Sequence, residues 1–111
     1  MSRSSTITDS GRRLGRIRTH PGEVLREEFM QPLGLSANAL ALALRVPATR
    51  IGAITRDHRP RAVTADTALR LARYFGTTPE FWLNLQSAYE LSVALSEGGP
   101  RIEREVQPRA A

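Results

Sequence analysis

Residues 38–54, with the sequence NALALALRVPATRIGAI, constrain the fold more than any other stretch of the chain. Leucine and alanine alternate from Leu40 to Leu44, as in a half-buried strand. However, residues 37–43 contain four alanines, and alanine is the best helix former and is depleted in strands. Pro47 follows closely and suits the first turn of a new helix. The stretch therefore predicts two short helices joined by a tight turn.

The apolar spacing gives each of these two helices a buried face and an outer face. The residues predicted to be buried are Leu40, Ala41, Leu44, Ile51 and Ile54. The residues predicted to point outward on the second helix are Ala48, Thr49, Arg50 and Ala53. Leu42 falls on a different face of the first helix from Leu40 and Leu44, which makes it either a contact for a partner or an ordinary exposed leucine.

A further helix is predicted to begin near His20, because Pro21 suits a first turn and Glu23 lies near the positive end of the helix dipole. Its apolar stripe consists of Val24, Leu25 and Phe29. We expect Pro32 and Gly34 to end this helix.

Two more helices are predicted in the second half of the chain. Thr64 caps the first of them, residues 65–75, and Gly76 ends it. Its inward side chains are predicted to be Leu69, Ala72 and Phe75 or their neighbours. Pro79 opens the last helix, which carries more apolar surface than one packed face needs and so indicates a dimer.

The ends of the chain differ from its middle in composition. Residues 1–18 are rich in Ser, Thr, Gly and Arg and predict a flexible arm. Residues 97–111 are rich in Gly, Pro and charge and predict a flexible tail. One all-α domain is therefore expected at residues 19–96.

All 16 basic residues of the chain are arginines, and the formal net charge is +5. Arginine binds phosphate and guanine through a planar fork, so this usage permits a nucleic-acid partner, although a GC-rich genome also replaces lysine codons. Residues 45–61 hold five arginines against the single acid Asp57, which gives 5 − 1 = +4 in seventeen residues. The positive charge is thus concentrated on and around the second of the two short helices.

The sequence offers little for catalysis or metal binding. There is no cysteine and there are two histidines, so we expect no disulfide, no metal and no cofactor. The acidic pairs Glu27/Glu28 and Glu103/Glu105 are read as solvated surface, so no enzyme activity and no small-molecule substrate are expected. No apolar run suits a membrane span or a secretion signal, which predicts a cytoplasmic protein with no membrane partner.

A helix-turn-helix consists of two short helices joined by a tight turn, and its second helix is polar on the outer face. The pair of helices predicted here has this arrangement, and arginines flank the second helix. The chain resembles the XRE-type helix-turn-helix regulators and, among them, the HigA-type antitoxins. Three segments carry the resemblance: HPGEVLREEFMQPLGLS at 20–36, LALALRVPATRI at 40–51 and TADTALRLARYFGTTPEFWLNLQSAYEL at 64–91.

The resemblance implies a five-helix, lambda-repressor-like domain that binds operator DNA as a homodimer and represses its own operon. It also implies a cognate toxin, in that family a RelE-like enzyme that cleaves mRNA. Val46 then joins the buried positions of the motif. The DNA-binding residues implied are Ser36, Asn38, Arg45, Ala48, Thr49, Arg50, Ala53, Arg56, Arg59 and Arg61. The expected dimer contacts are Phe81, Trp82, Leu85, Tyr89 and Val93, with a core role for Trp82 as the alternative.

The chain departs from the family pattern at three positions. The turn residue that is usually glycine is Arg45, which must adopt an unusual backbone conformation or reshape the turn. The usual glutamine at the start of the first helix is Ala37, and Gly52 lies inside the recognition helix. Two other functions therefore stay open: a regulator without a toxin, and a protein-interaction module without specific DNA binding.

Overall fold

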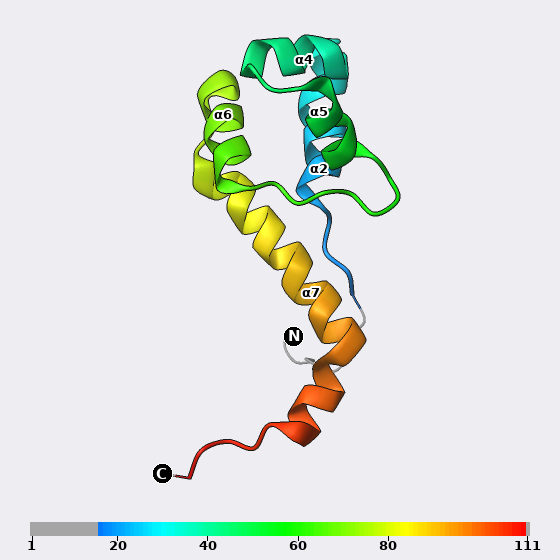
Figure 1. Ribbon diagram of the computed structural model, residues 1–111, viewed down its shortest axis with the longest axis vertical. Helices are drawn as coiled ribbons and strands as arrows, with labels where there is room; N and C mark the ends of the chain where they lie inside the picture. The colour runs from blue at the N-terminus through cyan, green and yellow to red at the C-terminus, as the bar shows by residue number, and fades with distance from the viewer. Residues whose placement is uncertain (1–15, 111) are drawn as a thin grey trace, which may run out of the picture. The chain divides into compact units, whose positions relative to one another are not determined.

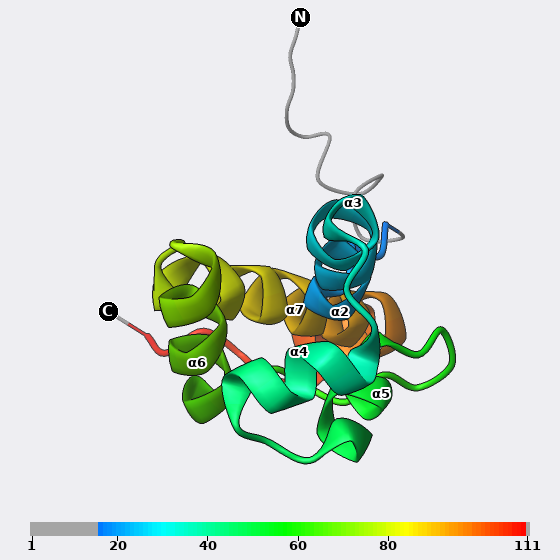
Figure 2. The same ribbon diagram turned by 90° about the horizontal axis from the view of Figure 1, so that it is seen from above.

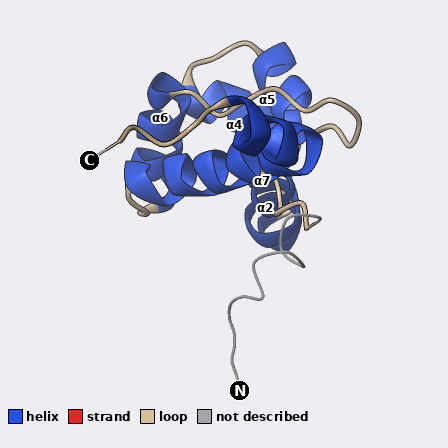
Figure 3. Cartoon of the chain, turned by 90° about the horizontal axis from the view of Figure 1, so that it is seen from below, coloured by secondary structure: helices blue, strands red, loops and turns tan. Residues whose placement is uncertain are grey.

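The computed structural model describes residues 16–110, and within them every regular element is a helix and none is a strand (Figure 3). The prediction of an all-α chain with five helices is confirmed, because the first three short elements follow one another without a break. In chain order the elements are α2 (Pro21–Val24), η1 (Leu25–Met30), α3 (Gln31–Leu33), α4 (Ala37–Leu44), α5 (Ala48–Thr55), α6 (Ala65–Phe75) and α7 (Pro79–Glu105) (Figure 1).

The chain divides into two compact units. One unit is Thr19–Ser87, and the described part of the other consists of residues 16–18 and 88–110. Within the second unit, the backbone N–H of Arg18 donates to Oγ of Ser92 at 2.9 Å. Most of the predicted flexible arm, residues 1–15, lies outside the described residues.

The first helix begins at a histidine cap. Nδ1 of His20 accepts from the backbone N–H of Gly22 at 2.8 Å and satisfies one of the free donors of the first turn. The expectation that Pro32 ends this helix is wrong, because the helix continues to Leu33 and ends at Gly34 with φ 64°. Pro32 lies in a helix that is continuous from Pro21, directly after the π-helical turns of η1, and its missing N–H leaves one carbonyl of that preceding turn without a backbone partner.

The alternating leucines and alanines from Leu40 to Leu44 lie in the helix α4, as predicted. Ser36 caps α4, with Oγ accepting from the backbone N–H of Ala39 at 3.0 Å. Arg45 lies in the left-handed region at φ 62° and ψ 45°, and the N–H of Val46 returns to the carbonyl of Ala41 at 3.0 Å. Figure 2 shows α4 and α5 joined by this short turn. The prediction that Arg45 takes an unusual backbone conformation is confirmed.

Replacing Arg45 with glycine is expected to raise the free energy of unfolding by about 1 kcal/mol, because glycine adopts positive φ without the clash that a Cβ causes. Chemical denaturation of the purified variant measures this change. Arg45→Ala is the matched control, since it removes the same side chain but keeps the Cβ. Equal effects of the two substitutions would contradict the backbone explanation.

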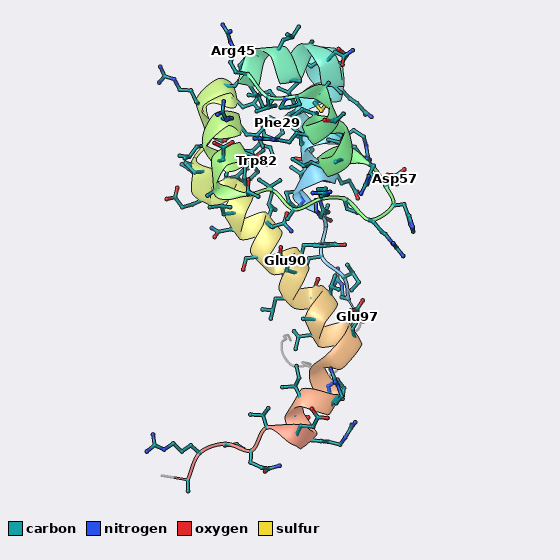
Figure 4. All side chains as sticks on the ribbon, viewed as in Figure 1. Phe29, Arg45, Asp57, Trp82, Glu90 and Glu97 are labelled. Carbon is teal, nitrogen blue, oxygen red and sulfur yellow. The ribbon has the colours of Figure 1, made fainter. Side chains whose placement is uncertain are left out.

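The core of the 19–87 unit is apolar, and the buried Trp82 joins it to an aromatic cluster that includes all three phenylalanines. The ring of Phe29 lies 4.9 Å from that of Phe75 and 5.1 Å from that of Trp82, and Phe81 packs edge-on against Trp82 at 5.0 Å. Figure 4 shows Phe29 and Trp82 facing one another among the helices. Nε1 of Trp82 donates to Oγ1 of Thr77 at 2.8 Å, so the polar atom of the indole is also satisfied.

Two packing predictions need correction. Trp82 has no exposed surface, so its expected place on a dimer surface is wrong and its core role is right. Leu69 is 59% exposed, while Ala68 and Leu71 are buried beside Ala72. The buried stripe of α6 therefore begins at Thr67, two residues before Leu69, and the small Ala68 side chain lets α6 approach its neighbours closely.

The expected tail at 97–111 is helical as far as Glu105, which corrects the predicted boundary. The segment Gly98-Gly99-Pro100 suggested a break, but α7 passes through it. The residue before a proline is restricted chiefly by its own Cβ and N–H, and Gly99 has no Cβ. No helix within residues 16–110 has both the length and the hydropathy needed to cross a bilayer.

Candidate nucleic-acid interface

Helix α5 presents one apolar face to the core and one small, polar face outward. Ile51 and Ile54 are buried, and Thr49 and Gly52 are exposed. Ala48, Arg50 and Ala53 are half-buried at the edges of the outer face. The small side chains leave the backbone of α5 open to close approach by a large ligand.

The C-terminal end of α5 is fixed by the first helix. A Cβ at Gly22 would lie only 1.9 Å from the carbonyl oxygen of Ile54, so α2 touches this end of α5 backbone to backbone. Nη1 of Arg26 donates to the carbonyl of Thr55 and lies 3.2 Å from Oδ1 of Asp57. Arg26 thereby satisfies a terminal carbonyl of α5 and ties down the loop that follows it.

The other side of α5 is linked to α6 through ion pairs. Nη1 of Arg50 donates to Oδ2 of Asp66 at 2.8 Å, and Nε of Arg70 donates to the same oxygen at 3.0 Å. Nη1 of Arg70 also donates to the carbonyl of Leu44, at the end of α4, at 2.9 Å. The hydrogen bonds from Arg70 and then Arg50 lower the pKa of the Asp66 carboxyl below its usual range.

A groove of about 780 Å³ runs beside α5, bounded by the segment that leads into α6. Its lining includes Thr49, Arg50, Ala53, Arg56, Arg61 and Asp66. The N–H of Arg61 donates to the carbonyl of Ala53 at 2.8 Å, which holds the returning segment against the helix. With three arginines against one aspartate, the groove is a basic channel suited to a polyanion.

The structure brings five of the ten predicted DNA-binding residues to this groove, namely Thr49, Arg50, Ala53, Arg56 and Arg61. The other five, Ser36, Asn38, Arg45, Ala48 and Arg59, do not line it. Ser36 and Asn38 lie at the start of α4, and Arg45 is exposed at its end (Figure 4). Arg59 lies in the loop after α5 with φ 50°, and its carbonyl accepts from Nε of Arg56 at 3.0 Å.

The residues predicted at a dimer contact, other than Trp82, are only partly covered. Phe81 is exposed, and Leu85, Tyr89 and Val93 are half-buried. In the 88–110 part of the chain, α7 also exposes Leu91, Leu95 and Ile102, spaced so that they share one side of the helix.

Four residues that position α5 were not predicted from the sequence, namely Gly22, Arg26, Asp66 and Arg70. The pair Asp66 and Arg70 has the i,i+4 spacing of helical ion pairs and could have been found. The pairs Arg26 with Thr55 and Arg50 with Asp66 join distant segments and carry no local signal. Within residues 16–110, no three His, Asp or Glu side chains converge in a way that could hold a metal ion.

Comparison with known proteins agrees with this geometry. A helix-turn-helix family model matches residues 27–82. Virulence-associated protein I of Dichelobacter nodosus is 59% identical over 75 residues, which cover 68% of each chain. The matched segments span 63 to 68% of the lengths of the first curated relatives.

Two solved structures cover nearly the whole length of their own chains. An addiction module antidote protein of the HigA family from Coxiella burnetii is 52% identical, with a TM-score of 0.77 over 85% of this chain and 100% of that one. Pseudomonas aeruginosa antitoxin HigA, solved with the higBA promoter, is 46% identical, with a TM-score of 0.78 over 83% of this chain and 98% of that one. The chain therefore belongs to the XRE-type helix-turn-helix family and, within it, to the HigA-type antitoxins.

Proposed function

We propose that this chain binds operator DNA as a dimer, represses its own operon and neutralises a RelE-like mRNA-cleaving toxin. The observation that carries the DNA-binding part is the arginine-lined groove beside the exposed face of α5. A similar protein, Pseudomonas aeruginosa HigA, was solved with the higBA promoter, which supports DNA binding by this chain.

In the proposed complex α5 lies in the major groove and α4 rests against the backbone. Thr49 is the exposed polar side chain of α5 and can bond a base edge, while the methyl groups of Ala48 and Ala53 can contact thymine. Arg56 and Arg61, on the groove wall, can bind phosphates and set the register. Oγ of Ser36 accepts within its own cap and keeps its hydrogen for donation to a phosphate.

The dimer is proposed on α7, which exposes large apolar side chains including Leu91 and Leu95. Two copies would place their recognition helices about 34 Å apart, one turn of the DNA helix. The operator is then expected to be approximately palindromic.

The proposed toxin partner is supported by the family membership. A regulator without a toxin is the alternative, and the neighbouring reading frame discriminates between the two. If a short reading frame lies next to this one, its expression alone should arrest growth, and co-expression of this chain should restore it. Growth arrest that this chain does not relieve would favour the regulator.

The DNA-binding part is tested by mobility shift of the purified chain on the duplex upstream of its own reading frame and on unrelated DNA, at two salt concentrations. We expect preference for the upstream duplex, and an affinity that falls steeply with salt because the arginines release counterions. The double variant Thr49→Ala/Arg50→Ala should lose most of the preference. Arg73→Ala, which changes an exposed arginine of α6 outside the groove, is the control. Failure of the wild type to prefer its own upstream DNA would contradict the proposal.

A further inference from the structure

One carboxylate joins the recognition helix to the rest of its unit. Oδ2 of Asp66 accepts from Arg50 on α5 and from Arg70 on α6, at 2.8 and 3.0 Å. Asp66 lies in the first turn of α6, where the helix dipole favours a negative charge. Its side chain is 55% exposed, so the ion pairs are reachable from solvent.

The carboxylate is itself held in place. Arg70 donates through Nε to Asp66 and through Nη1 to the carbonyl of Leu44, which ends α4. A continuous chain of contacts therefore runs from the end of α4 through Arg70 and Asp66 to Arg50. Both helices of the helix-turn-helix are tied to α6 by this one network.

The network limits the ways in which Arg50 can meet DNA. A guanidinium has five N–H donors in a rigid fork, and a donor on Nη1 is directed to Asp66. The side chain is 39% exposed, so part of the fork still faces the groove beside α5. A long side chain held in one geometry loses less conformational entropy on binding than a free one.

We propose that Asp66 is a positioning residue that sets the orientation of Arg50 for DNA and thereby contributes to the choice of operator over other DNA. This inference rests on the proposed operator binding. Asp66 also carries a negative charge beside the groove, which opposes all phosphates alike. The carboxylate therefore weakens binding to any DNA while improving the fit to the correct DNA.

The two effects of the Asp66 carboxylate predict opposite changes in affinity and in selectivity when its charge is removed. In Asp66→Asn the repulsion is removed, so affinity for unrelated DNA should rise. The ion pair with Arg50 is lost at the same time, and a neutral amide oxygen holds the guanidinium less firmly, so the ratio of affinities for the upstream and unrelated duplexes should fall by about tenfold. Glu80→Gln is the matched control, because it neutralises another exposed acid in the first turn of a helix, one that does not line the groove beside α5. It should leave the ratio unchanged.

A double-variant comparison separates positioning from simple charge. If Asp66 acts through Arg50, Asp66→Asn should change the ratio in the wild type and leave it unchanged in an Arg50→Ala background. Arg70→Gln keeps both residues of the pair and should lower the ratio by a smaller factor. Thermal unfolding of each variant checks that it is folded.

The outcomes separate the two proposals. If the wild type prefers its upstream DNA and Asp66→Asn has the same ratio of affinities for upstream and unrelated DNA, the positioning role is overturned and operator binding is retained. An equal change of the ratio with and without Arg50 would also overturn it. A wild type without preference for its upstream DNA would overturn both.

Discussion

Replacing Trp82 with alanine is expected to lower the free energy of unfolding by about 3–5 kcal/mol, at the upper end of what truncating one core side chain costs. Trp82 is completely buried and packs against the rings of Phe29 and Phe81. Its removal leaves a cavity among the aromatic rings and also removes the donor to Thr77. Chemical denaturation, followed by circular dichroism, measures the change.

Two other variants give this prediction its controls. Leu42→Ala removes a large apolar side chain that is 77% exposed and should change the free energy of unfolding by less than about 0.5 kcal/mol. Thr77→Val removes the acceptor of the indole N–H and should cost about 1 kcal/mol. A Trp82→Ala variant as stable as Leu42→Ala would show that the Trp82 side chain is not part of the packed core.

Replacing Gly22 with alanine is expected to destabilise the protein by about 3 kcal/mol or more, by forcing α2 away from α5. The new Cβ would lie 1.9 Å from the carbonyl oxygen of Ile54 and 2.8 Å from its carbon, and a backbone carbonyl cannot rotate away. Because this contact fixes the end of the recognition helix, DNA affinity should fall together with stability. Chemical denaturation and the mobility shift on the upstream duplex measure the two effects.

Gly52→Ala provides the matched control for Gly22→Ala. Gly52 lies inside α5 with nothing within 4 Å of its added Cβ, so alanine should stabilise the free protein by about 0.5–1 kcal/mol. Glycine-to-alanine substitution is thus expected to lower the free energy of unfolding at Gly22 and to raise it at Gly52, which tests the packing explanation directly. Destabilisation of similar size at both positions would contradict it.

The sequence was sufficient to predict the helix-turn-helix itself. The alanines of α4, the proline before α5 and the spacing of Leu40, Leu44, Ile51 and Ile54 are local signals, and the structure follows them. For Arg45 the family resemblance, in which this turn residue is usually glycine, implied an unusual backbone or a reshaped turn, and the structure has the positive φ. Local chemistry therefore places the recognition helix and its outer face.

What the sequence did not predict depends on contacts between distant segments. Arg50 and Asp66 are sixteen positions apart, and Gly22 meets a carbonyl at Ile54, so no pattern within one helix indicates either contact. The prediction also failed at Pro100, for a different reason. The local sequence Gly98-Gly99-Pro100 indicated the end of a helix, but α7 continues through it to Glu105. The distant pairings decide how rigidly the recognition helix is held.

The proposed function requires this chain to bind the DNA upstream of its own reading frame through two symmetric recognition helices. A hydroxyl-radical footprint of the purified protein on that DNA tests it most directly. We predict two protected segments related by a twofold axis, with centres about 10 base pairs apart. Protection of the whole duplex without boundaries, or no protection at low salt, would contradict the claim.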